Sequence, residues 1–449
     1  MMPFPISDAT PIAFPGPPPR ETDVVVIGGG VIGVCTALFL ARKGRRVVLL
    51  EKGRIAAEQS SRNWGWIRQQ GRDPQELPIM VEANHLWTEL AAQTNVDIGL
   101  VRSGVTYLAE SETELQSFAN WLPHATAQGV DTELLDRSAL KARFPDLAKS
   151  GIHGALTTPS DMRAEPWVTV PALAGIAVRE GAVIVEGCAA RKLDLEGGRV
   201  TGVHSEAGRI ACCDVVVAGG AWSSLFLRAH GVAIPQLSVR ASAGATEPVA
   251  LPHQGAAAAA DFAFRMRADG GASLAAGGFH ELFIGPDAVR ALPKYAAQLR
   301  ADPFGTRFYP AAPGGYPDAW TTRRQWQADE VSPFERMRVL NPKPNSAKLR
   351  KVAAAVERLF PQVGPIRYRA MWAGMIDTLP DVVPVVDRVD AIPGLTIGTG
   401  MSGHGFGIGP GMGRVLADLV CGAAPGHDLG RFRLSRFSDG SRMDLGPAL

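Results

Sequence analysis

The sequence predicts an α/β protein with a parallel sheet and an interleaved antiparallel sheet. Two short apolar runs, residues 23–27 and 395–398, each lead into a glycine-rich segment that is followed by an apolar stretch of helical length. Such runs are typical of strands buried on both faces of a parallel sheet. Between them, residues 262–267 alternate at period two before an Asp-Gly-Gly turn, as expected for an antiparallel hairpin.

The composition indicates a large globular protein and excludes several other classes. The chain has 449 residues, of which 46% are apolar and 20% charged, so it can form two or three domains and is not mostly disordered. Its 46 basic and 44 acidic residues give no general basic surface for nucleic acid. No uninterrupted apolar stretch of about 18 residues predicts a membrane span.

The cysteines and the N-terminal segment bear on the cellular compartment. Five scattered cysteines, none in a Cys-x-x-Cys pair, argue against a disulfide framework and against a zinc site, so no metal is expected. A reducing, cytoplasmic location follows as the expectation. Residues 1–20 are rich in proline and lack the basic and apolar regions of a signal peptide, which predicts a disordered arm.

The first unit, residues 23–51, is predicted to fold as strand, helix and strand around the turn sequence G-x-G-x-x-G. Gly28 permits the tight turn, Gly30 lets a pyrophosphate approach the backbone, and Gly33 lets helix and strand pack closely. Glu51 ends the second strand, where its carboxylate can accept hydrogen bonds from a ribose and would repel the 2′-phosphate of NADP. This unit alone leaves FAD and NAD open, since both use the same cradle.

Three later segments favour a flavin. Residues 60–66 place two serines before two tryptophans, which suits a loop that passes a diphosphate and reaches an isoalloxazine; an ordinary surface loop is the alternative. Residues 210–217 predict a strand that ends in small residues, and residues 182–188 and 198–204 predict strands of a small meander beside it. Residues 399–413 are rich in glycine and begin a helix, whose positive end would stabilise charge on a reduced flavin.

Together these motifs resemble the D-amino-acid-oxidase-like superfamily of FAD oxidoreductases, which includes glycine oxidase, sarcosine oxidase and D-amino-acid dehydrogenase. The resemblance extends from Asp23 to around Leu419 and depends on GGGVIG with Glu51, VVVAGGAWS and TGMSGHGFGIGP. It implies a Rossmann-like, two-dinucleotide FAD-binding domain interleaved with an antiparallel-sheet substrate domain. It also implies oxidation of the C–N bond of an amino acid or secondary (N-alkyl) amine, with hydride transfer to flavin N5 and hydrolysis of the imine.

The resemblance implies that the two domains alternate along the chain. The FAD-binding domain is expected to comprise residues 21–84, 151–235 and 366–435, and the substrate domain residues 85–150 and 236–365. Residues 1–20 would form the disordered arm and residues 436–449 a C-terminal tail.

FAD is expected to bind non-covalently. Some members attach the flavin through a His after the paired serines or through a Cys on the strand before the closing helix, but Arg62 and Gly374 occupy those positions here. The resemblance implies cofactor contacts from Gly28, Gly30, Val31, Ile32, Gly33, Glu51, Lys52, Ser60, Ser61, Arg62, Asn63, Trp64, Gly65, Trp66, Ala190, Ala218, Gly219, Gly220, Trp222, Gly374, Gly403, His404, Gly405, Phe406, Gly407 and Ile408.

The substrate side departs from the family pattern. Many relatives have an Arg-Pro-x-Thr-Pro-Asp-x-x-Pro segment whose Arg clamps a substrate carboxylate, but here that segment begins with Ile376 and Asp377. Asp377 could bind a cationic amine or could be a plain turn residue. Arg265 and Arg267 share one face of a predicted strand, where they could hold a carboxylate or could be solvated. The candidate catalytic residues are Asp377, Arg68 and His404.

The electron acceptor and two competing functions stay open. Sarcosine-type oxidases carry a Lys on a substrate-domain strand that promotes reaction with oxygen, and the comparable residues 271–278 contain none. This favours a dehydrogenase that passes electrons to a quinone or partner protein, with oxygen as the alternative. The competing functions are a flavoprotein dehydrogenase of a 2-hydroxy acid and an FAD-binding subunit of a larger electron-transfer complex.

Overall fold

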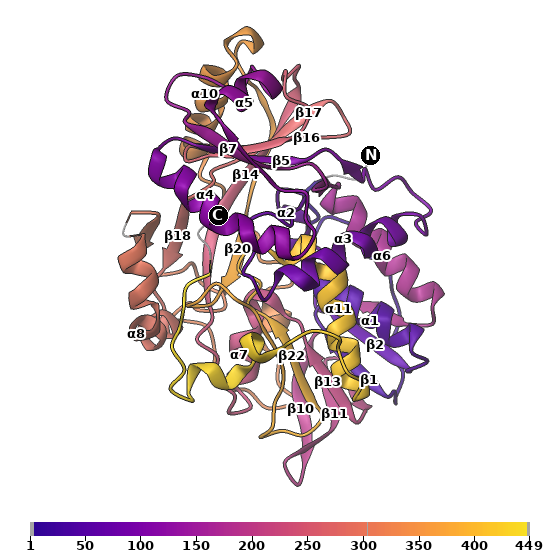
Figure 1. The fold of residues 1–449 in the computed structure, drawn as a ribbon. Coiled ribbons are helices and arrows are strands. Elements are labelled where there is room, and N and C mark those ends of the chain that lie inside the picture. Colours follow the sequence, from indigo (N-terminus) through magenta and orange to yellow (C-terminus); the bar gives the residue numbers. More distant parts are fainter. Residues whose placement is uncertain (1–3, 303, 447–449) are drawn as a thin grey trace.

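The computed structural model describes residues 4–302 and 304–446 of the chain (Figure 1). One of its two large sheets has six strands and contains the predicted βαβ unit. The strand order is β21 (Val385–Arg388), β22 (Leu395–Thr399), β13 (Asp214–Val217), β1 (Val24–Ile27), β2 (Val47–Glu51) and β9 (Val183–Glu186). All neighbouring pairs are parallel except β21 with β22, so the predicted parallel sheet is confirmed.

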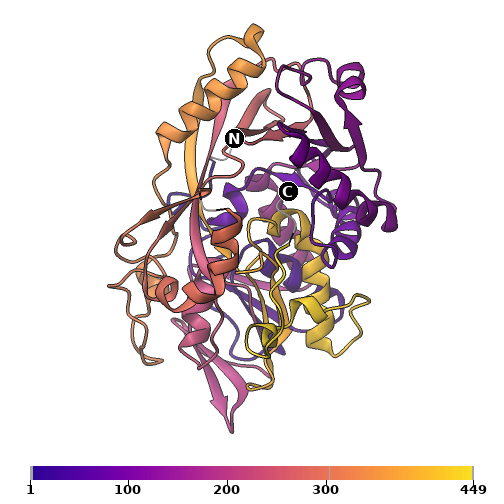
Figure 2. The ribbon, with the colours of Figure 1, turned by 60° about the vertical axis from the view of Figure 1, so that its left-hand side comes forward.

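Each face of the six-stranded sheet is covered by its own layer. Side chains alternate along a strand, so Val24 and Val26 of β1 pack in one layer and Val25 packs in the other. The first layer contains the helices α1 (Val31–Arg42), α3 (Leu77–Ala91), α6 (Pro166–Arg179) and α11 (Gly405–Cys421). The second contains α7 (Ser223–Arg228) and the meander of β10 (Ala190–Glu196), β11 (Arg199–Ser205) and β12 (Gly208–Ala211), whose tip projects at the bottom of Figure 2.

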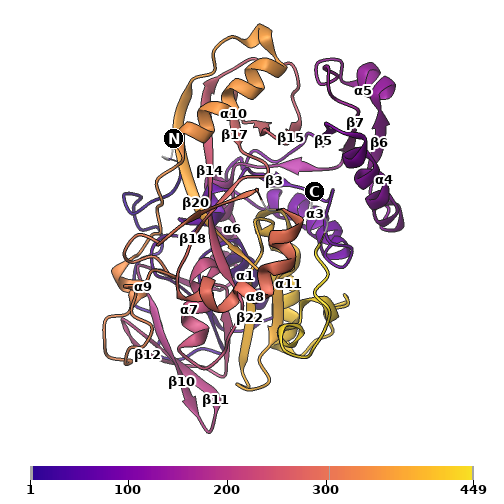
Figure 3. The ribbon, with the colours of Figure 1, turned by 90° about the vertical axis from the view of Figure 1, so that its left-hand side faces the viewer.

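The second large sheet has ten strands and forms the upper part of the molecule in Figure 3. Its order is β19 (Thr306–Tyr309), β18 (His280–Phe283), β14 (Leu237–Pro248), β17 (Gly271–Ala275), β16 (Phe262–Met266), β15 (Ala256–Ala259), β5 (Val105–Ala109), β7 (Gly154–Thr158) and β6 (Glu133–Asp136), with β20 (Tyr368–Thr378) paired to β14. Most neighbours are antiparallel, as predicted, but β5 with β15 and β18 with β19 are parallel.

Four helices pack around the ten-stranded sheet. The helix α10 (Ser346–Leu359) covers β14, β16 and β17, α4 (Glu112–Ala127) and α5 (Arg137–Arg143) contact β6 and β7, and α8 (Pro286–Ala301) contacts β14. The buried residues of α10, including Leu349, Val352, Val356 and Leu359, recur at helical spacing, so one face of α10 belongs to the core. The remaining short elements are α2 (Gln59–Arg62), β3 (Trp66–Ile67), β4 (Val101–Arg102), β8 (Met162–Arg163) and α9 (Pro333–Arg336).

The structure corrects three of the predicted segment assignments. The strands β7 and β20 lie in the ten-stranded sheet, although residues 151–235 and 366–435 were assigned to the FAD-binding domain. Residues 183–186 join the parallel sheet as β9 instead of the meander. The residue pattern of a single strand does not predict which sheet the strand joins. For β20 this is decided by its pairing with β14, which extends along almost its whole length.

The glycines of the closing helix α11 have two different uses. Gly409, Gly411 and Gly413 face the neighbouring helices, where an added Cβ would collide with Val31 and Cys35 of α1 and with Ile79 of α3. They therefore allow α1, α3 and α11 to pack closely. The glycines between residues 400 and 407 lie at the strand-to-helix turn, at or near the candidate site described below.

Residues 4–20 do not form the predicted disordered arm. Ile6 is buried in the main core and Phe4 stacks on Trp167, with ring centroids 4.6 Å apart. The Glu186 carboxylate accepts the backbone N–H groups of Ala13 at 2.5 Å and Phe14 at 3.0 Å. Proline removes donors and disfavours regular structure, but it does not prevent an extended segment from packing on a surface.

Replacing Glu186 with alanine is expected to detach this segment. The carboxylate also accepts the N–H of Ile55 at 2.6 Å. The substitution therefore removes the acceptor that three backbone N–H groups share. Trypsin cleavage after the exposed Arg20 should become about tenfold faster, because cleavage follows the population of the locally open form. The matched control is Glu196→Ala, at the exposed end of β10; equal cleavage rates in both variants would contradict the role of Glu186.

The C-terminal segment is also anchored as far as it is described. The Arg436 guanidinium donates to both carboxylate oxygens of the buried Asp381, at 2.8 and 3.2 Å. Gly446 donates its N–H to the Asp381 carbonyl oxygen at 3.3 Å. The last three residues of the predicted tail, 447–449, lie outside the described residues. Within residues 4–302 and 304–446, no helix combines the length and apolar character needed to cross a membrane.

Candidate functional site

A cavity of about 790 Å³ is lined by residues of both large sheets. One end lies at the carboxyl ends of β1, β2 and β13, where α1 begins. The other end lies beneath β14 and β15 and beside the start of α11. Ligands of open α/β sheets bind at the carboxyl ends of parallel strands, so this is the expected place for a dinucleotide.

The βαβ end of the cavity is shaped to receive a phosphate. Gly28 has a φ of +112°, and a Cβ there would collide with the carbonyl oxygen of Ala218. A Cβ on Gly33 would collide with the carbonyl oxygen of Gly28, so both glycines are needed for the close turn. The helix α1 has no side-chain cap at Gly30, and its first residues line the cavity with the positive end of the helix dipole.

Glu51 is placed to receive a ribose. Its Oε2 accepts the N–H of Gly29 at 2.7 Å and its Oε1 accepts the N–H of Gly53 at 2.6 Å. Each oxygen keeps capacity for a further hydrogen bond, and the residue lines the cavity. Burial raises the pKa of this carboxyl to about 7 in the absence of a ligand.

Lys52 lies at the same end, but its ammonium is already used by the protein. It forms an ion pair with Glu58 at 2.6 Å and donates to the carbonyl oxygens of Met337 and Arg338. It also lies 4.4 Å from the ring centroid of Trp222, whose indole N–H donates to Glu58. Lys52 therefore links Glu58 to residues 337–338 at this end of the cavity.

The segment around α2 forms the middle of the cavity wall. The Ser60 hydroxyl accepts the N–H of Val31 at 2.9 Å and so sits at the start of α1. The buried Arg62 donates to Asn341 and to the carbonyl oxygens of Ala57 and Ala373, and it packs beside Gly374. The positions at which some relatives attach the flavin are thus adjacent in space, and here they offer no nucleophile.

Asp377 lies in the cavity wall and supports the turn before α11. Its Oδ2 accepts the Gly400 N–H at 2.7 Å and the Thr399 hydroxyl at 3.2 Å, while its carbonyl oxygen accepts the Ser402 N–H. Burial raises the pKa of the Asp377 carboxyl. These two hydrogen bonds to Oδ2 make Asp377 a residue of the turn before α11, which is one of the two roles that the sequence left open.

A polar cluster lies beside the start of α11. Arg68, Arg72 and His404 line the cavity, and His404 Nδ1 is 3.8 Å from the Oε2 of the buried Glu76. The guanidinium of Arg68 lies over the Tyr107 ring, 5.0 Å from its centroid. Burial, reinforced by Arg72 and Arg68, lowers the pKa of His404 well below its usual range, so the imidazole is neutral at neutral pH.

The structure does not place Arg265 and Arg267 at the cavity, which contradicts their predicted substrate contact. Both side chains are buried on β16 and beside its end. Arg265 pairs with both carboxylate oxygens of Glu165, at 2.9 and 2.8 Å, and also donates to the Trp64 carbonyl oxygen. Arg267 donates to the Ala272 and Thr246 carbonyl oxygens and to Asp269. These arginines have partners within the protein and are not directed to a ligand.

Most of the other predicted cofactor residues do line the cavity, and four do not. The four exceptions are Gly33, Ser61, Gly65 and Ile408. Gly33 acts through helix packing, as its motif predicts, whereas Ser61 is buried behind the wall. Gly65 lies against the Arg265 side chain. Ile408 belongs to the core beside α11.

Sequence reasoning missed three features of the wall. Arg72 lines it from the segment between β3 and α3, where no local pattern marks the residue. Tyr107 comes from β5, which the period-two pattern of residues 105–109 could have placed in the sheet but not at the cavity. The run of alanines at 256–260 has no chemical signature, yet it forms β15 and gives the cavity a wall of small side chains.

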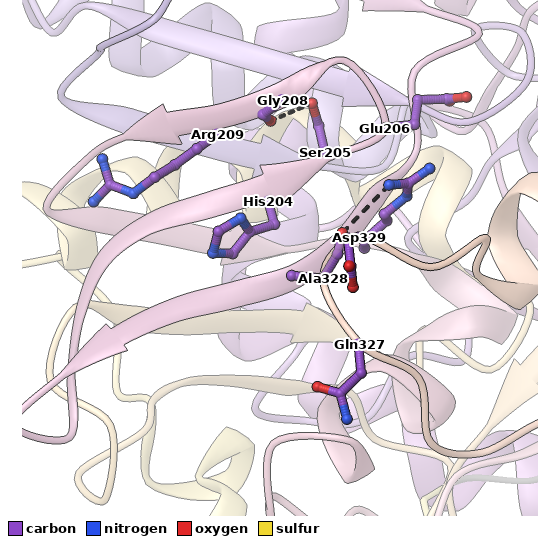
Figure 4. Close-up of a pocket in the computed structure, with 9 residues that line it drawn as sticks. His204, Ser205, Glu206, Gly208, Arg209, Gln327, Ala328 and Asp329 are labelled. Carbon is purple, nitrogen blue, oxygen red and sulfur yellow. Dashed lines mark hydrogen bonds between the residues drawn. The ribbon is translucent and has the colours of Figure 1, made fainter.

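A second hollow lies at the meander and is shown in Figure 4. It is lined by residues that include Arg191, His204, Arg209 and Asp329. Arg191 is paired with Glu335 at 2.7 Å, and Arg209 with Asp194 at 2.6 Å. Both of these arginines are therefore paired within the protein. Within the described residues no cluster of three or more His, Cys, Asp and Glu side chains could hold a metal ion.

Comparison with known proteins agrees with this geometry. Sarcosine oxidase subunit beta from Rhizobium meliloti is 26% identical over 436 residues, which cover 96% of this chain and 91% of that protein. Mitochondrial sarcosine dehydrogenase from Mus musculus is 28% identical over 240 residues, 52% of this chain but only 26% of that longer protein. The structure of L-amino acid deaminase from Proteus myxofaciens in complex with anthranilate superimposes with a TM-score of 0.89, at 28% identity, over 95% of this chain and 96% of that one.

The family is shown by a match over most of the chain. The family model described as DAO, FAD dependent oxidoreductase, matches residues 23–419. The glycine cradle, the Glu51 carboxylate at the end of β2 and the long cavity between the starts of α1 and α11 are consistent with a site for FAD. The chain therefore belongs to the DAO family of FAD-dependent oxidoreductases.

Proposed function

We propose that the protein oxidises the C–N bond of an amino acid or secondary amine, with FAD bound non-covalently along the cavity. The observation that carries this proposal is the cavity itself, which joins a dinucleotide cradle at Gly28 to a chamber with small side chains beneath the ten-stranded sheet. The relatives named above act, by their names, on sarcosine and amino acids.

Each part of the wall has a distinct task in this proposal. The start of α1 and the Ser60 hydroxyl hold the diphosphate, and Glu51 holds the adenosine ribose. Asn63, Trp64, Trp66 and residues 403–407 surround the isoalloxazine, where α11 directs its positive end at the ring. Bound there, FAD would supply the acceptor for a hydride from the carbon next to nitrogen.

The neighbouring residues orient the substrate and keep water out. The aromatic rings of Trp64, Trp66 and Tyr107 and the alanines of β15 form an apolar chamber. Such a chamber favours the neutral amine over the ammonium ion, because burial penalises charge. Only a neutral amine has the lone pair that assists hydride loss, so exclusion of water serves the reaction.

We infer that the electron acceptor is a quinone or a partner protein and that the protein acts in the cytoplasm. Lys52 is the lysine that lines the cavity in the described part of the chain, and it lies at the ribose end. Lys294, the lysine nearest to residues 271–278 in sequence, donates instead to the Phe437 carbonyl oxygen. Neither lysine therefore provides a positive charge near the flavin ring that could assist its reaction with oxygen. The free cysteines support a reducing compartment.

The proposal is tested by the spectrum of the purified protein and by anaerobic reduction. A flavin band and its bleaching by N-alkyl or unmodified amino acids are expected, with no bleaching by 2-hydroxy acids. Purification without flavin would contradict the cofactor, and bleaching by hydroxy acids alone would favour the other dehydrogenase. No bleaching by any small amine would favour a flavin-binding subunit, which the name of the Rhizobium meliloti relative makes the second candidate. Peroxide formation in air would point to oxygen as the acceptor.

A further inference from the structure

The proposed reaction must remove a proton from its substrate, and His404 is placed to take it. At neutral pH an amine in water is mostly an ammonium ion, whereas loss of hydride needs the neutral amine. Glu51 and Glu58 lie at the ribose end of the cavity, where Glu58 is paired with Lys52. The Asp377 carboxylate accepts two hydrogen bonds from the turn before α11. His404 lies in the cavity wall at the start of α11, beside the expected position of the flavin ring.

The His404 ring separates the cavity from a buried acidic residue. Its side chain is 22% exposed and lines the cavity, but its Nδ1 is buried. This nitrogen lies 3.8 Å from the Oε2 of Glu76, the residue before α3, whose side chain is 2% exposed. Glu76 does not line the cavity; it lies behind His404, where α3 and α11 are neighbours (Figure 1). One ring nitrogen therefore faces the carboxylate, and Nε2 is left for the cavity.

The atoms that face each other here have no other hydrogen-bond partners. Among the described residues, His404 Nδ1 and both carboxylate oxygens of Glu76 are buried and make no hydrogen bond. Folded proteins pair the large majority of such atoms. A separation of 3.8 Å is longer than a hydrogen bond, but catalytic hydrogen bonds are often long before substrate binds and shorten in the complex. A proton shared between Nδ1 and Oε2 would satisfy both groups.

The surrounding charges decide the protonation of the two groups. Burial, reinforced by Arg72 and Arg68, lowers the pKa of His404 well below its usual range, so the imidazole does not hold a second proton. Burial raises the pKa of Glu76 to about 7, so this carboxyl can take and release a proton near neutral pH. The charged groups that act on Glu76 are Arg68, Arg72, Asp73, Asp381 and Arg431. A neutral imidazole can still pass a proton on, because it gains one at one nitrogen as it loses one at the other.

We propose that His404 and Glu76 form a relay that removes the proton of the substrate's ammonium group. The substrate N–H bond breaks as an N–H bond forms at His404 Nε2, and the Nδ1–H bond breaks as an O–H bond forms at Glu76. The substrate nitrogen keeps the electron pair, the imidazole stays neutral in its other tautomer, and the proton lies on Glu76. The reverse shift, with loss of the Nε2 proton to water after the product leaves, restores the pair.

The two residues have different roles in this relay. His404 contacts the substrate and is the catalytic residue. Glu76 acts through His404 as a positioning residue, since its ionised carboxylate holds the tautomer with the proton on Nδ1. The assignment rests on the proposed function, because the ammonium group belongs to the amine substrate.

The relay is tested by the pH dependence of anaerobic flavin reduction in the holoenzyme. The probe is the amino acid that bleaches the wild-type flavin fastest, at saturating concentration. The wild-type rate should rise with pH until about pH 7, where Glu76 becomes ionised. In Glu76→Gln the rate should fall by about 100-fold at pH 7 and recover above about pH 9, where the neutral amine enters from solution. Glu76→Asp keeps a carboxyl group and should retain part of the rate.

The shape of the pH profile separates a relay from a structural role. Glu76→Gln removes no side-chain hydrogen bond of the described structure. A loss of rate that is equal at every pH, or an unchanged profile, would overturn the relay. His404→Phe should show the same loss at pH 7 and the same recovery at high pH. The matched control is Glu89→Gln, at an exposed position of the same helix, which should keep the wild-type rate and profile.

A second measurement observes the pair without substrate. In holoenzyme that contains ¹⁵N-labelled histidine, the proton of His404 should lie on Nδ1 above about pH 7 and on Nε2 below it, where protonated Glu76 donates to Nδ1. Glu76→Gln should lose this change of tautomer. Its absence from the wild type would overturn the relay even if amines reduce the flavin. Failure of every amine to reduce the flavin, with the tautomer change present, would instead contradict the proposed function and with it the ammonium group as the source of the proton.

Discussion

Replacing Glu51 with glutamine is expected to weaken FAD binding by about 10- to 100-fold while the chain stays folded. The carboxylate holds the N–H groups of Gly29 and Gly53 and offers its remaining acceptor capacity to the ribose. Glutamine keeps the shape but replaces one acceptor oxygen with an NH₂ group, which faces a backbone donor. Titration of FAD into the apoprotein measures the dissociation constant, and circular dichroism checks the fold.

The pH dependence of FAD binding provides an independent check on Glu51. Its pKa is raised by burial to about 7 in the ligand-free protein, so the group is protonated below that pH. Ribose hydroxyls donate to the ionised form, and binding therefore releases a proton. FAD affinity should rise with pH, by at most about tenfold per unit, until about pH 7 and then level off.

The variant and one control decide the interpretation of these titrations. Glu51→Gln should lose this part of the pH dependence, because no carboxyl is left to titrate at that position. Glu21→Gln, an exposed position beside β1, should keep both the wild-type affinity and the slope. An unchanged dissociation constant in Glu51→Gln would show that the ribose is bound elsewhere.

The sequence predicted the parts of the molecule in which local pattern and function coincide. The turn around Gly28 demands a backbone that only glycine adopts easily, so its position in the chain reveals its geometry. Glu51 follows because a strand of known length places its last side chain at the same edge of the sheet. The same reasoning located the segments that begin at Ser60, Ala218 and Gly403 on the cavity wall.

The substrate side could not be predicted because it is built from contacts between distant segments. The period-two pattern placed Arg265 and Arg267 on one face of a strand but could not tell which face is covered. The covering carboxylate belongs to Glu165, the residue before α6, which is 100 residues away in sequence. Arg72 and the alanines of β15 have no local signature at all. Their place at the cavity depends on how the ten-stranded sheet packs against the helical layer that contains α3 and α11, which is a tertiary property.

Replacing Arg265 with methionine is expected to lower the free energy of unfolding by about 3–5 kcal/mol. The substitution leaves the Glu165 carboxylate buried without its guanidinium partner, although the Ala268 N–H still donates to it at 2.9 Å. It also removes the donor to the Trp64 carbonyl oxygen, which fixes the loop that leads to Trp66 at the cavity. Guanidinium chloride denaturation measures the stability, and visible circular dichroism of bound FAD reports the loop.

A double variant separates these two consequences. In Arg265→Met/Glu165→Leu no charge is left unpaired, so stability should recover substantially, since apolar replacements of buried ion pairs are often neutral. The flavin signal should stay altered, because the Trp64 carbonyl still lacks its donor. Arg46→Met breaks an exposed ion pair with Asp23 and should leave the free energy of unfolding nearly unchanged, because exposed pairs contribute little. If Arg265 instead bound the substrate carboxylate, its replacement would weaken the binding of benzoate relative to that of its neutral analogue benzamide and would change the stability little. The burial of Arg265 against Glu165 leads us to expect the reverse.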